Sequence, residues 1–586
     1  MTQRAYQTRE IQGLMPAVEP TQTDEIFVLR GENYVFDSKG PKSAFGDRFM
    51  AHQPFLSPEG MSAVRVKLRG GDKCFYFSRH GIYDWQEGTR DFRLLYRFTP
   101  LLYDLTAWSV AYVNGYVFMN HPSVGILAYE VDSEYVVPAA SVGTGVPSSV
   151  LYIAANQSRL IAVTEDAFHY SAQGDGFDFA PRLGFAGFQL IKDLVPGSPL
   201  GVVSFPYGCL TWTTGGLIRS EFRGDAAVYS HDAIDTQFRP INSHCIAKVN
   251  KDASVILDER GLFTSEGGAV TPYDEAFNEF FIGFVRENSL ALGDYARLEW
   301  DETHQHLFVS LGTDQYESIF DVAFVYYPAV SKWGQMNHKH HAIVPIEIPT
   351  GAREISTAGI IDDTGRVRMF TPVYSRQAPI SARGDYDFLD YVRSQLQPPT
   401  FYTHDSEVTA VSSRKPLHSQ SIVNSVAGYV SPGGVTPQTG PLIGLGSSVK
   451  LGFFRAATGM AHDELSELHG LTLRSRVRDP GGPDSSRDDP ENRSAEDYDP
   501  FNVASQIPKF DPMHHEVHGI RVAGSIDGTD EFTYAVPHLA RLSSNARFYS
   551  FTTLGIWHSI ELYAVNAGEA FAPTAIVITA TPAGTL

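Results

Sequence analysis

One short pattern recurs along the first two thirds of this chain: an apolar strand, a polar turn that ends in a small residue, and a second apolar or aromatic strand. The clearest copies end their turns at Gly81, Gly125, Ala167, Gly216, Gly261 and Gly365, and a looser copy turns at Gly312. Successive turns are separated by 44, 42, 49, 45, 51 and 53 residues. Because this spacing is close to the length of a four-stranded propeller blade, it predicts an irregular, multi-bladed β-propeller.

Each turn has the chemistry of a tight hairpin. A hairpin of this kind needs a positive φ at one or two central positions, which glycine adopts without steric cost. Each pair of flanking strands must bury one face, and residues 307–311 are an example of such an apolar strand. A single copy would be an ordinary hairpin, so the prediction of a propeller depends on the repeat.

Composition extends the mainly β interpretation to the whole chain. The 37 Phe, 28 Tyr and 51 Gly favour strands and turns, and 586 residues are enough for more than one domain. We expect an N-terminal arm or platform segment at 1–60, the propeller at 61–372, and a C-terminal β-rich domain at 373–586 that resembles a β-sandwich. Two stretches, 274–287 and 385–397, place apolar residues on one helical face and predict helices.

A third region of distinct composition lies inside the C-terminal domain. Residues 479–500 contain eight carboxylates and two arginines among Pro, Gly and Ser, a net charge of −6. Such a stretch cannot bury enough apolar surface to order itself, so it predicts a mobile acidic loop.

Charge and cysteine content narrow the class of protein. With 46 basic against 67 acidic side chains the net charge is −21. This charge disfavours tight binding to nucleic acid, but it is compatible with the wall of a channel through which DNA passes without being bound. Three widely spaced cysteines predict neither a disulfide framework nor a zinc site, and we expect buried thiols in a reducing compartment. The start of the chain lacks the apolar core of a signal peptide, and no run is long enough to span a membrane.

Several segments at the ends of the expected blades resemble those of one protein family. Residues 169–179 are similar to the aromatic-Ser-x-x-Gly-Asp-x-x-[Asn/Asp]-Phe segment of the tail nozzle proteins of short-tailed bacteriophages, also called tail tubular protein B. Residues 257–264 resemble a strand-turn-strand segment of the same proteins, and 296–334 resemble their late blade, which ends at Trp333. The arm residues 30–33 and 40–42 resemble the beginning of such chains.

The resemblance covers residues 30–370 in detail and the whole chain in layout. It implies a structural virion protein without enzymatic activity, a homohexameric ring at the distal end of the tail that retains the genome and opens for DNA ejection. The implied partners are other copies of the chain, the adaptor ring on the portal side, tail fibres or spikes, and DNA in passage, with no membrane insertion. The implied location is the virion tail, assembled in the host cytoplasm. The acidic insertion at 479–500 departs from the family.

The sequence offers few residues for chemistry, and we name no catalytic, cofactor-binding or metal-binding residue. Basic residues of the arm and a histidine-rich segment are candidates for contact with other subunits: Lys39, Lys42, Arg48, His338, His340 and His341. For the three histidines a solvated loop is the favoured interpretation. His514, Glu516 and His518 alternate as ligands on one strand face would, but an exposed polar face is commoner than a metal site.

Two carboxylate patterns have structural interpretations as well. Asp175 and Asp178 lie among glycines, but neither the ligand spacing of a calcium loop nor the order of a sialidase aspartate box is present. The pairs at 258–259 and 362–363 would serve glycoside hydrolysis only if they converged in a cleft, and aspartate is common in hairpin turns. A propeller that binds or degrades carbohydrate is therefore the alternative function, and an intracellular propeller that docks peptides is a third.

Overall fold

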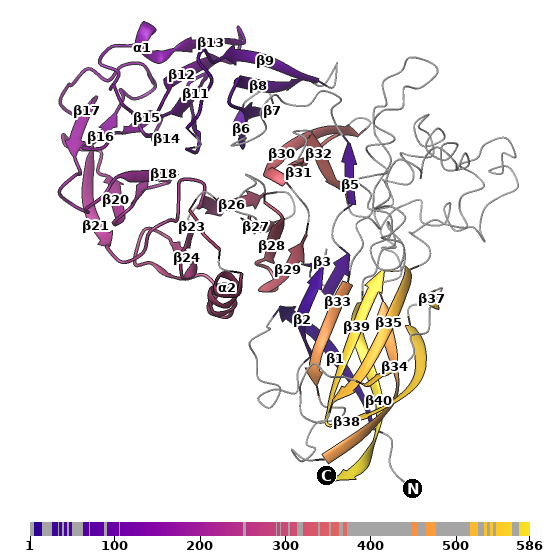
Figure 1. The fold of residues 1–586 in the computed structure, drawn as a ribbon. Helices are drawn as coiled ribbons and strands as arrows, with labels where there is room; N and C mark the ends of the chain where they lie inside the picture. Colours follow the sequence, from indigo (N-terminus) through magenta and orange to yellow (C-terminus); the bar gives the residue numbers. More distant parts are fainter. Residues whose placement is uncertain are drawn as a thin grey trace, which may run out of the picture. The chain divides into compact units, whose positions relative to one another are not determined.

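The computed structural model describes residues 5–14, 26–49, 62–371, 448–475 and 516–585, with short gaps inside all but the first range (Figure 1). The chain divides into two compact units. The larger comprises Gln53–Ala323 and Lys339–Val367, and the other comprises Met1–His52, Phe324–His338 and Arg368–Leu586.

Within the described residues six blades form a β-propeller, which confirms the mainly β prediction (Figure 1). The first three blades are β6 (Ser62–Leu68), β7 (Gly71–Phe77), β8 (Gly81–Gln86) and β9 (Asp91–Arg97); β10 (Ser109–Val113), β11 (Tyr116–His121), β12 (Gly125–Glu130) and β13 (Tyr135–Pro138); and β14 (Tyr152–Asn156), β15 (Arg159–Val163), β16 (Ala167–Tyr170) and β17 (Gly187–Leu190). A short helix, α1 (Ala139–Val142), follows β13.

The next three blades continue the same order of antiparallel strands. They are β18 (Pro199–Phe205), β19 (Gly208–Thr213), β20 (Gly216–Phe222) and β21 (Tyr229–Asp235); β22 (Ile246–Val249), β23 (Ala253–Asp258), β24 (Gly261–Ser265) and β25 (Thr271–Pro272); and β26 (Ala296–Asp301), β27 (His306–Leu311), β28 (Val322–Tyr327) and β29 (Lys332–Met336). The sheet of the sixth blade extends to β3 (Tyr34–Asp37) and β4 (Gly40–Ser43). A further sheet follows, of β30 (His340–Thr350), β31 (Arg353–Asp362), β32 (Val367–Thr371) and β5 (Gly46–Phe49).

The recurring turns of the sequence occupy one position in the fold. In the first five blades the turn residue begins the third strand, at Gly81, Gly125, Ala167, Gly216 and Gly261. At the last of these φ is +118°, and a Cβ there would collide with the side chain of Asn278. The Leu262 amide donates to Asn278 Oδ1 at 2.6 Å, so the turn is closed by a helix outside the blade.

That helix is α2 (Glu275–Glu287), which confirms the sequence prediction for 274–287. Asp274 caps its start by accepting a hydrogen bond from the Phe277 amide at 2.9 Å. Phe277 and Phe281 are buried together with Asn278, because residues three and four apart lie on one helical face. The second expected helix, 385–397, lies outside the described residues.

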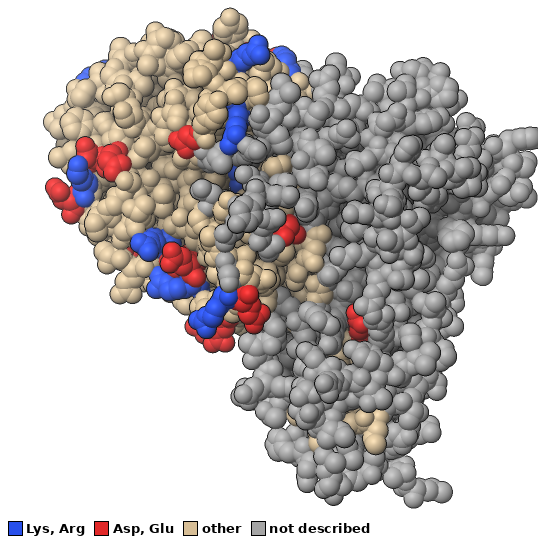
Figure 2. Space-filling view, in the orientation of Figure 1, with Lys and Arg blue, Asp and Glu red and all other residues tan. Residues whose placement is uncertain are grey.

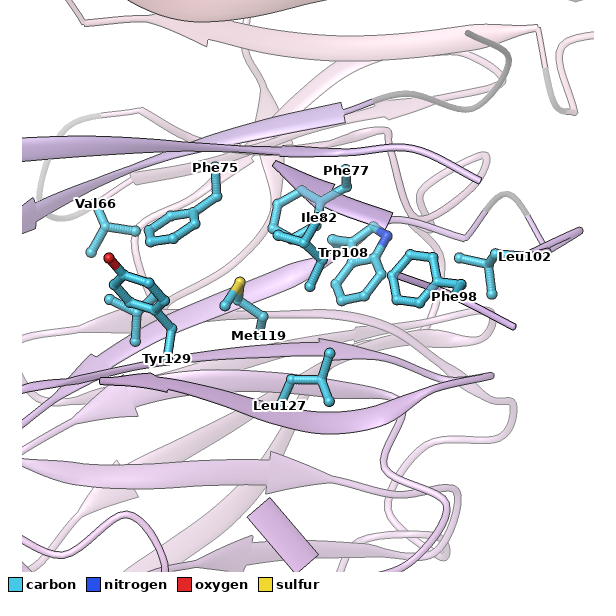
Figure 3. Packing of buried hydrophobic residues seen from close by; sticks show 11 residues of the cluster. Val66, Phe75, Phe77, Ile82, Phe98, Leu102, Trp108, Met119, Leu127 and Tyr129 are labelled. Atoms are coloured by element: carbon cyan, nitrogen blue, oxygen red, sulfur yellow. The ribbon is translucent and has the colours of Figure 1, made fainter. Parts of the chain in front are cut away.

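Aromatic side chains fill the space between the first two blades (Figure 3). Phe77 stacks on Trp108 with ring centroids 4.5 Å apart, and Phe98 lies 5.7 Å from the same indole. Phe75 meets Tyr129 edge to face at 5.2 Å. In each contact one ring belongs to blade 1 or to the segment that follows it. The other ring belongs to blade 2 or to the segment that precedes it, so aromatic packing holds the two blades together.

The other unit holds a ten-stranded sheet built from both ends of the chain. Its main strand order is β36-β35-β39-β33-β2-β1-β40-β34-β38, and β37 pairs with β35. The strands are β1 (Ala5–Leu14), β2 (Ile26–Glu32), β33 (Ser448–Phe454), β34 (Glu464–Ser475), β35 (Glu516–Ser525), β36 (Thr533–Ala535), β37 (Ala540–Leu542), β38 (Ala546–Gly555), β39 (Trp557–Ala564) and β40 (Pro573–Thr585).

The N-terminal segment takes part in several sheets. β1 pairs with β40, β3 pairs with β29, and β5 pairs with β32. The expected boundaries of 1–60, 61–372 and 373–586 stay predictions, as does the sandwich arrangement of the C-terminal strands. The predicted acidic loop at 479–500 lies outside the described residues.

The packing between blades 1 and 2 predicts a large effect of one substitution. Replacing Trp108, only 9% exposed, by Ala should lower the free energy of unfolding by about 3–5 kcal/mol, because it removes a buried indole and leaves a cavity between two blades. Urea denaturation followed by circular dichroism measures the shift. Tyr135→Ala, at a side chain that is 69% exposed, is the control and should change the midpoint little; equal effects of the two would contradict this packing.

Candidate functional site

One candidate site is a cavity of about 570 Å³ lined by the first strands of several blades, and we call it the axial cavity. Its walls come from the first strands of blades 1, 2, 5 and 6, namely β6, β10, β22 and β26, and from β30. Apolar and aromatic residues of the wall include Val66, Tyr112, Ile246, Trp300 and Val344. The cavity lies wholly within the larger unit.

Most charged residues of the wall have protein partners. Lys67 pairs with Glu302 at 2.8 Å, and this ion pair links blade 1 to blade 6. Arg65 pairs with Asp72 on the neighbouring strand. Lys248 donates to the carbonyl oxygen of Ser204 at 2.6 Å. These interactions join strands and blades, so the charges act first in holding the ring together.

Glu299 is the acid of the wall with the most altered titration. Its Oε1 accepts a hydrogen bond from the Ile343 amide at 3.2 Å, and Arg297 lies 3.9 Å away. A fifth of the side chain remains exposed. Burial raises the pKa of Glu299 to about 7, and the nearby guanidinium offsets only part of that effect.

The histidine-rich segment lies beside Glu299. His340 and His341 belong to β30 and are only 2% and 4% exposed, so the expectation of a solvated loop is wrong for both. The His340 ring is 2.9 Å from Ser310 Oγ, and the carbonyl oxygen of His341 accepts from Arg297 at 3.2 Å. The contact with Ser310 gives the buried His340 ring a hydrogen-bond partner on a neighbouring strand.

A second cluster of charges joins blades 1 and 2. The carboxylate of Asp84, which is fully buried, forms ion pairs with Arg93 at 2.7 Å and with Lys73 at 3.1 Å. The same two cations bind Glu134 of blade 2 at 2.7 and 3.1 Å. Hydrogen bonds from Arg93 and Lys73 hold the pKa of Glu134 at about 2. The cluster is a structural tie, because each carboxylate is shared by two cations.

The segment that resembles the nozzle family, 169–179, also joins blades. Asn114 of blade 2 donates to the carbonyl oxygen of Gly174 at 2.9 Å. Phe177 packs against Tyr116 and Phe118 of the same blade, with ring centroids 4.9 and 5.0 Å away. Asp175 and Asp178 accept hydrogen bonds from amides two residues ahead, which agrees with a structural turn.

The remaining candidates of the sequence are spread over the fold. Lys42 lies on β4 opposite Val35, and Arg48 lies on β5 opposite Met369. Lys39, His338 and His514 lie outside the described residues, whereas Glu516 and His518 lie on β35. Their role at an interface stays a prediction. Among the described residues no group of three or more His, Cys, Asp or Glu side chains could hold a metal ion.

The three cysteines are buried, as the sequence predicts, and all three are thiols. Burial raises the pKa of the Cys209 and Cys245 thiols to about 12, so these two remain protonated near neutral pH. No helix in the described part of the chain is both long and apolar enough to cross a membrane.

Comparisons with known proteins find distant structural similarity. No family model and no curated protein matches the sequence. Among solved structures, U3-55K is 9% identical and matches 56% of this chain and 98% of its own, with a TM-score of 0.35. The β-propeller domain of Cps50 (Swd1) from Myceliophteria thermophila is 11% identical over 54% of this chain and 99% of its own, with a TM-score of 0.33.

The environment of Glu299 predicts a pH-dependent stability. Its pKa in the folded state lies above the ordinary value of 4.5. The stability that the protonated Glu299 carboxyl contributes is therefore complete below pH 4.5 and is lost as the pH rises through 7. The difference in unfolding free energy between Glu299→Gln and the wild type should therefore change with pH. From pH 4.5 to 8 it should shift in favour of the variant by roughly 2–3 kcal/mol.

Urea denaturation at several pH values measures this difference. Glu302→Gln is the matched control, because Glu302 lies on the same wall and is 55% exposed. The control should show no comparable change over this range. A difference for Glu299→Gln that stays constant from pH 4.5 to 8 would rule out the raised pKa.

Proposed function

We propose that this chain is a structural subunit of the tail of a short-tailed bacteriophage and forms the nozzle at its distal end. In this proposal the propeller is a rigid block, several copies surround a passage for DNA, and the subunit has no enzymatic activity. The resemblance of the sequence to nozzle proteins is the basis for proposing this family. The contacts made by residues 169–179 support a mechanical role.

The observation that carries the proposal is the position of residues 169–179. This segment, the most specific part of the resemblance, bonds and packs against blade 2 through Asn114, Tyr116 and Phe118. It adds a backbone bridge between Thr144 and Asp178. A segment that stiffens the junction of two blades suits a subunit whose task is to keep its shape.

The axial cavity, about 570 Å³, has the size of a small-molecule pocket within one chain, so in this proposal the passage for DNA lies between copies of the chain. On the visible face of the larger unit several acidic and basic groups lie next to one another (Figure 2), and Lys192 with Asp166 and Arg219 with Asp232 are two such pairs in the structure. Such a surface does not grip a polyanion as a basic patch would.

The proposal predicts assembly into closed rings. The full chain, mixed with the adaptor ring of its tail, should give ring-shaped particles in negative-stain images and a mass several times the 64.6 kDa of one chain. Light scattering on the same sample measures that mass, and the chain mixed with an unrelated ring protein is the control. A chain that remains a monomer with its adaptor at every concentration, or that cleaves polysaccharide, would refute the nozzle function.

A further inference from the structure

A group of large apolar side chains is exposed on blade 3. Leu183, Phe185, Phe188 and Leu190 are 84%, 64%, 52% and 67% exposed. The last two belong to β17, the outermost strand of its sheet, and the first two lie in the turn just before it. We call these four residues the β17 patch. Contiguous exposed apolar side chains on a folded protein mark a surface that contacts another macromolecule.

The turn that carries the first half of the patch is held in place. Arg182 and Ala186 exchange backbone hydrogen bonds of 2.7 and 3.2 Å, and Arg182 also pairs with Asp178. The guanidinium of Arg159, itself 5% exposed, donates to the carbonyl oxygens of Phe185 and Ser171. The exposed side chains therefore project from an anchored backbone, and little conformational entropy is lost when they bind.

The second half of the patch is oriented by Gln189. Its Nε2 donates to the carbonyl oxygens of Ala227 and Tyr229, each at 2.9 Å, and its Oε1 meets His231 at 2.6 Å. Gln189 thus faces blade 4. Because side chains alternate along a strand, Phe188 and Leu190 face the other way and remain open to solvent.

The β17 patch also lacks the features that protect strand edges. Exposed edges usually carry charged residues or proline, which discourage pairing with another chain. β9 and β21 carry charges, and β13 and β25 contain Pro138 and Pro272. In the first five blades of the described chain, β17 alone has neither, and residues 183–191 form an uncharged run.

The occupant of the patch follows from charge. Two copies of a chain with a net charge of −21 repel one another, so they can approach closely only where carboxylates are absent. At the two ends of the uncharged run, Lys192 pairs with Asp166 and Arg182 pairs with Asp178 within the blade. We propose that the β17 patch packs against a neighbouring copy of this chain; this inference rests on the proposed ring and names one of its contacts.

The test compares two variants of the full chain. Leu183→Ser combined with Phe185→Ser should weaken self-association at least tenfold, as measured by light scattering over a series of concentrations. Tyr207→Ser is the matched control, because Tyr207 is 78% exposed on blade 4, and it should leave association unchanged. Added salt should strengthen association of the wild type, since it screens the repulsion between copies while leaving an apolar contact intact.

Hydrogen exchange gives a second measurement that does not depend on variants. Amides of residues 183–190 in the wild type should exchange more slowly as concentration rises and copies associate. Unchanged exchange in the assembled state, or assembly of the double variant at the wild-type concentration, would overturn the inference. If rings persist in the double variant, the nozzle function stands and the contact is wrong; if the patch forms only two-fold dimers, the contact stands and the nozzle function is wrong.

Discussion

A blade of this propeller has two apolar faces, and it can cover neither of them by itself. In blade 2 the alternation along β11 sends Val117 and Met119 into the cluster shared with blade 1, and Phe118 into the cluster shared with blade 3. A sheet of this kind in isolation would expose both rows to water. Successive blades must therefore pack face to face, and the propeller follows from this constraint.

The same constraint decides where polar groups are placed. Polar side chains between blades are paired across the junction, as when Asn156 of blade 3 donates to the carbonyl oxygens of Phe205 and Gly208 in blade 4. Tyr229 returns a hydrogen bond to the same amide at 3.0 Å. An unpaired group in these positions would cost about 1–3 kcal/mol, so such pairs fix the register of one blade against the next.

The sequence predicts the parts of this fold that depend on local chemistry. Recurring turns that end in a small residue, 42 to 49 residues apart, locate the third strand of five blades. A capping Asp274 with apolar residues on one face locates α2. It does not show that β1 pairs with β40, because these partners are more than 550 residues apart and share only alternation. It also misses the burial of His340 and His341, since a polar run indicates solvent unless its partners on other strands are known.

The candidate sites also differ in whether they depend on residues close together in the sequence or on residues far apart in it. The wall of the axial cavity draws on five strands that are remote from one another in sequence, so no local motif could reveal it. The apolar residues of 183–190 are local in sequence, but longer uncharged runs such as 105–129 and 194–218 occur elsewhere, so only the structure shows that these side chains are exposed. Packing between blades uses both faces of a sheet but leaves the edge of its last strand free. Gln189 of β17 bonds to blade 4, but the exposed Phe188 and Leu190 on the same strand face away from it, and their composition therefore points to a contact outside the subunit.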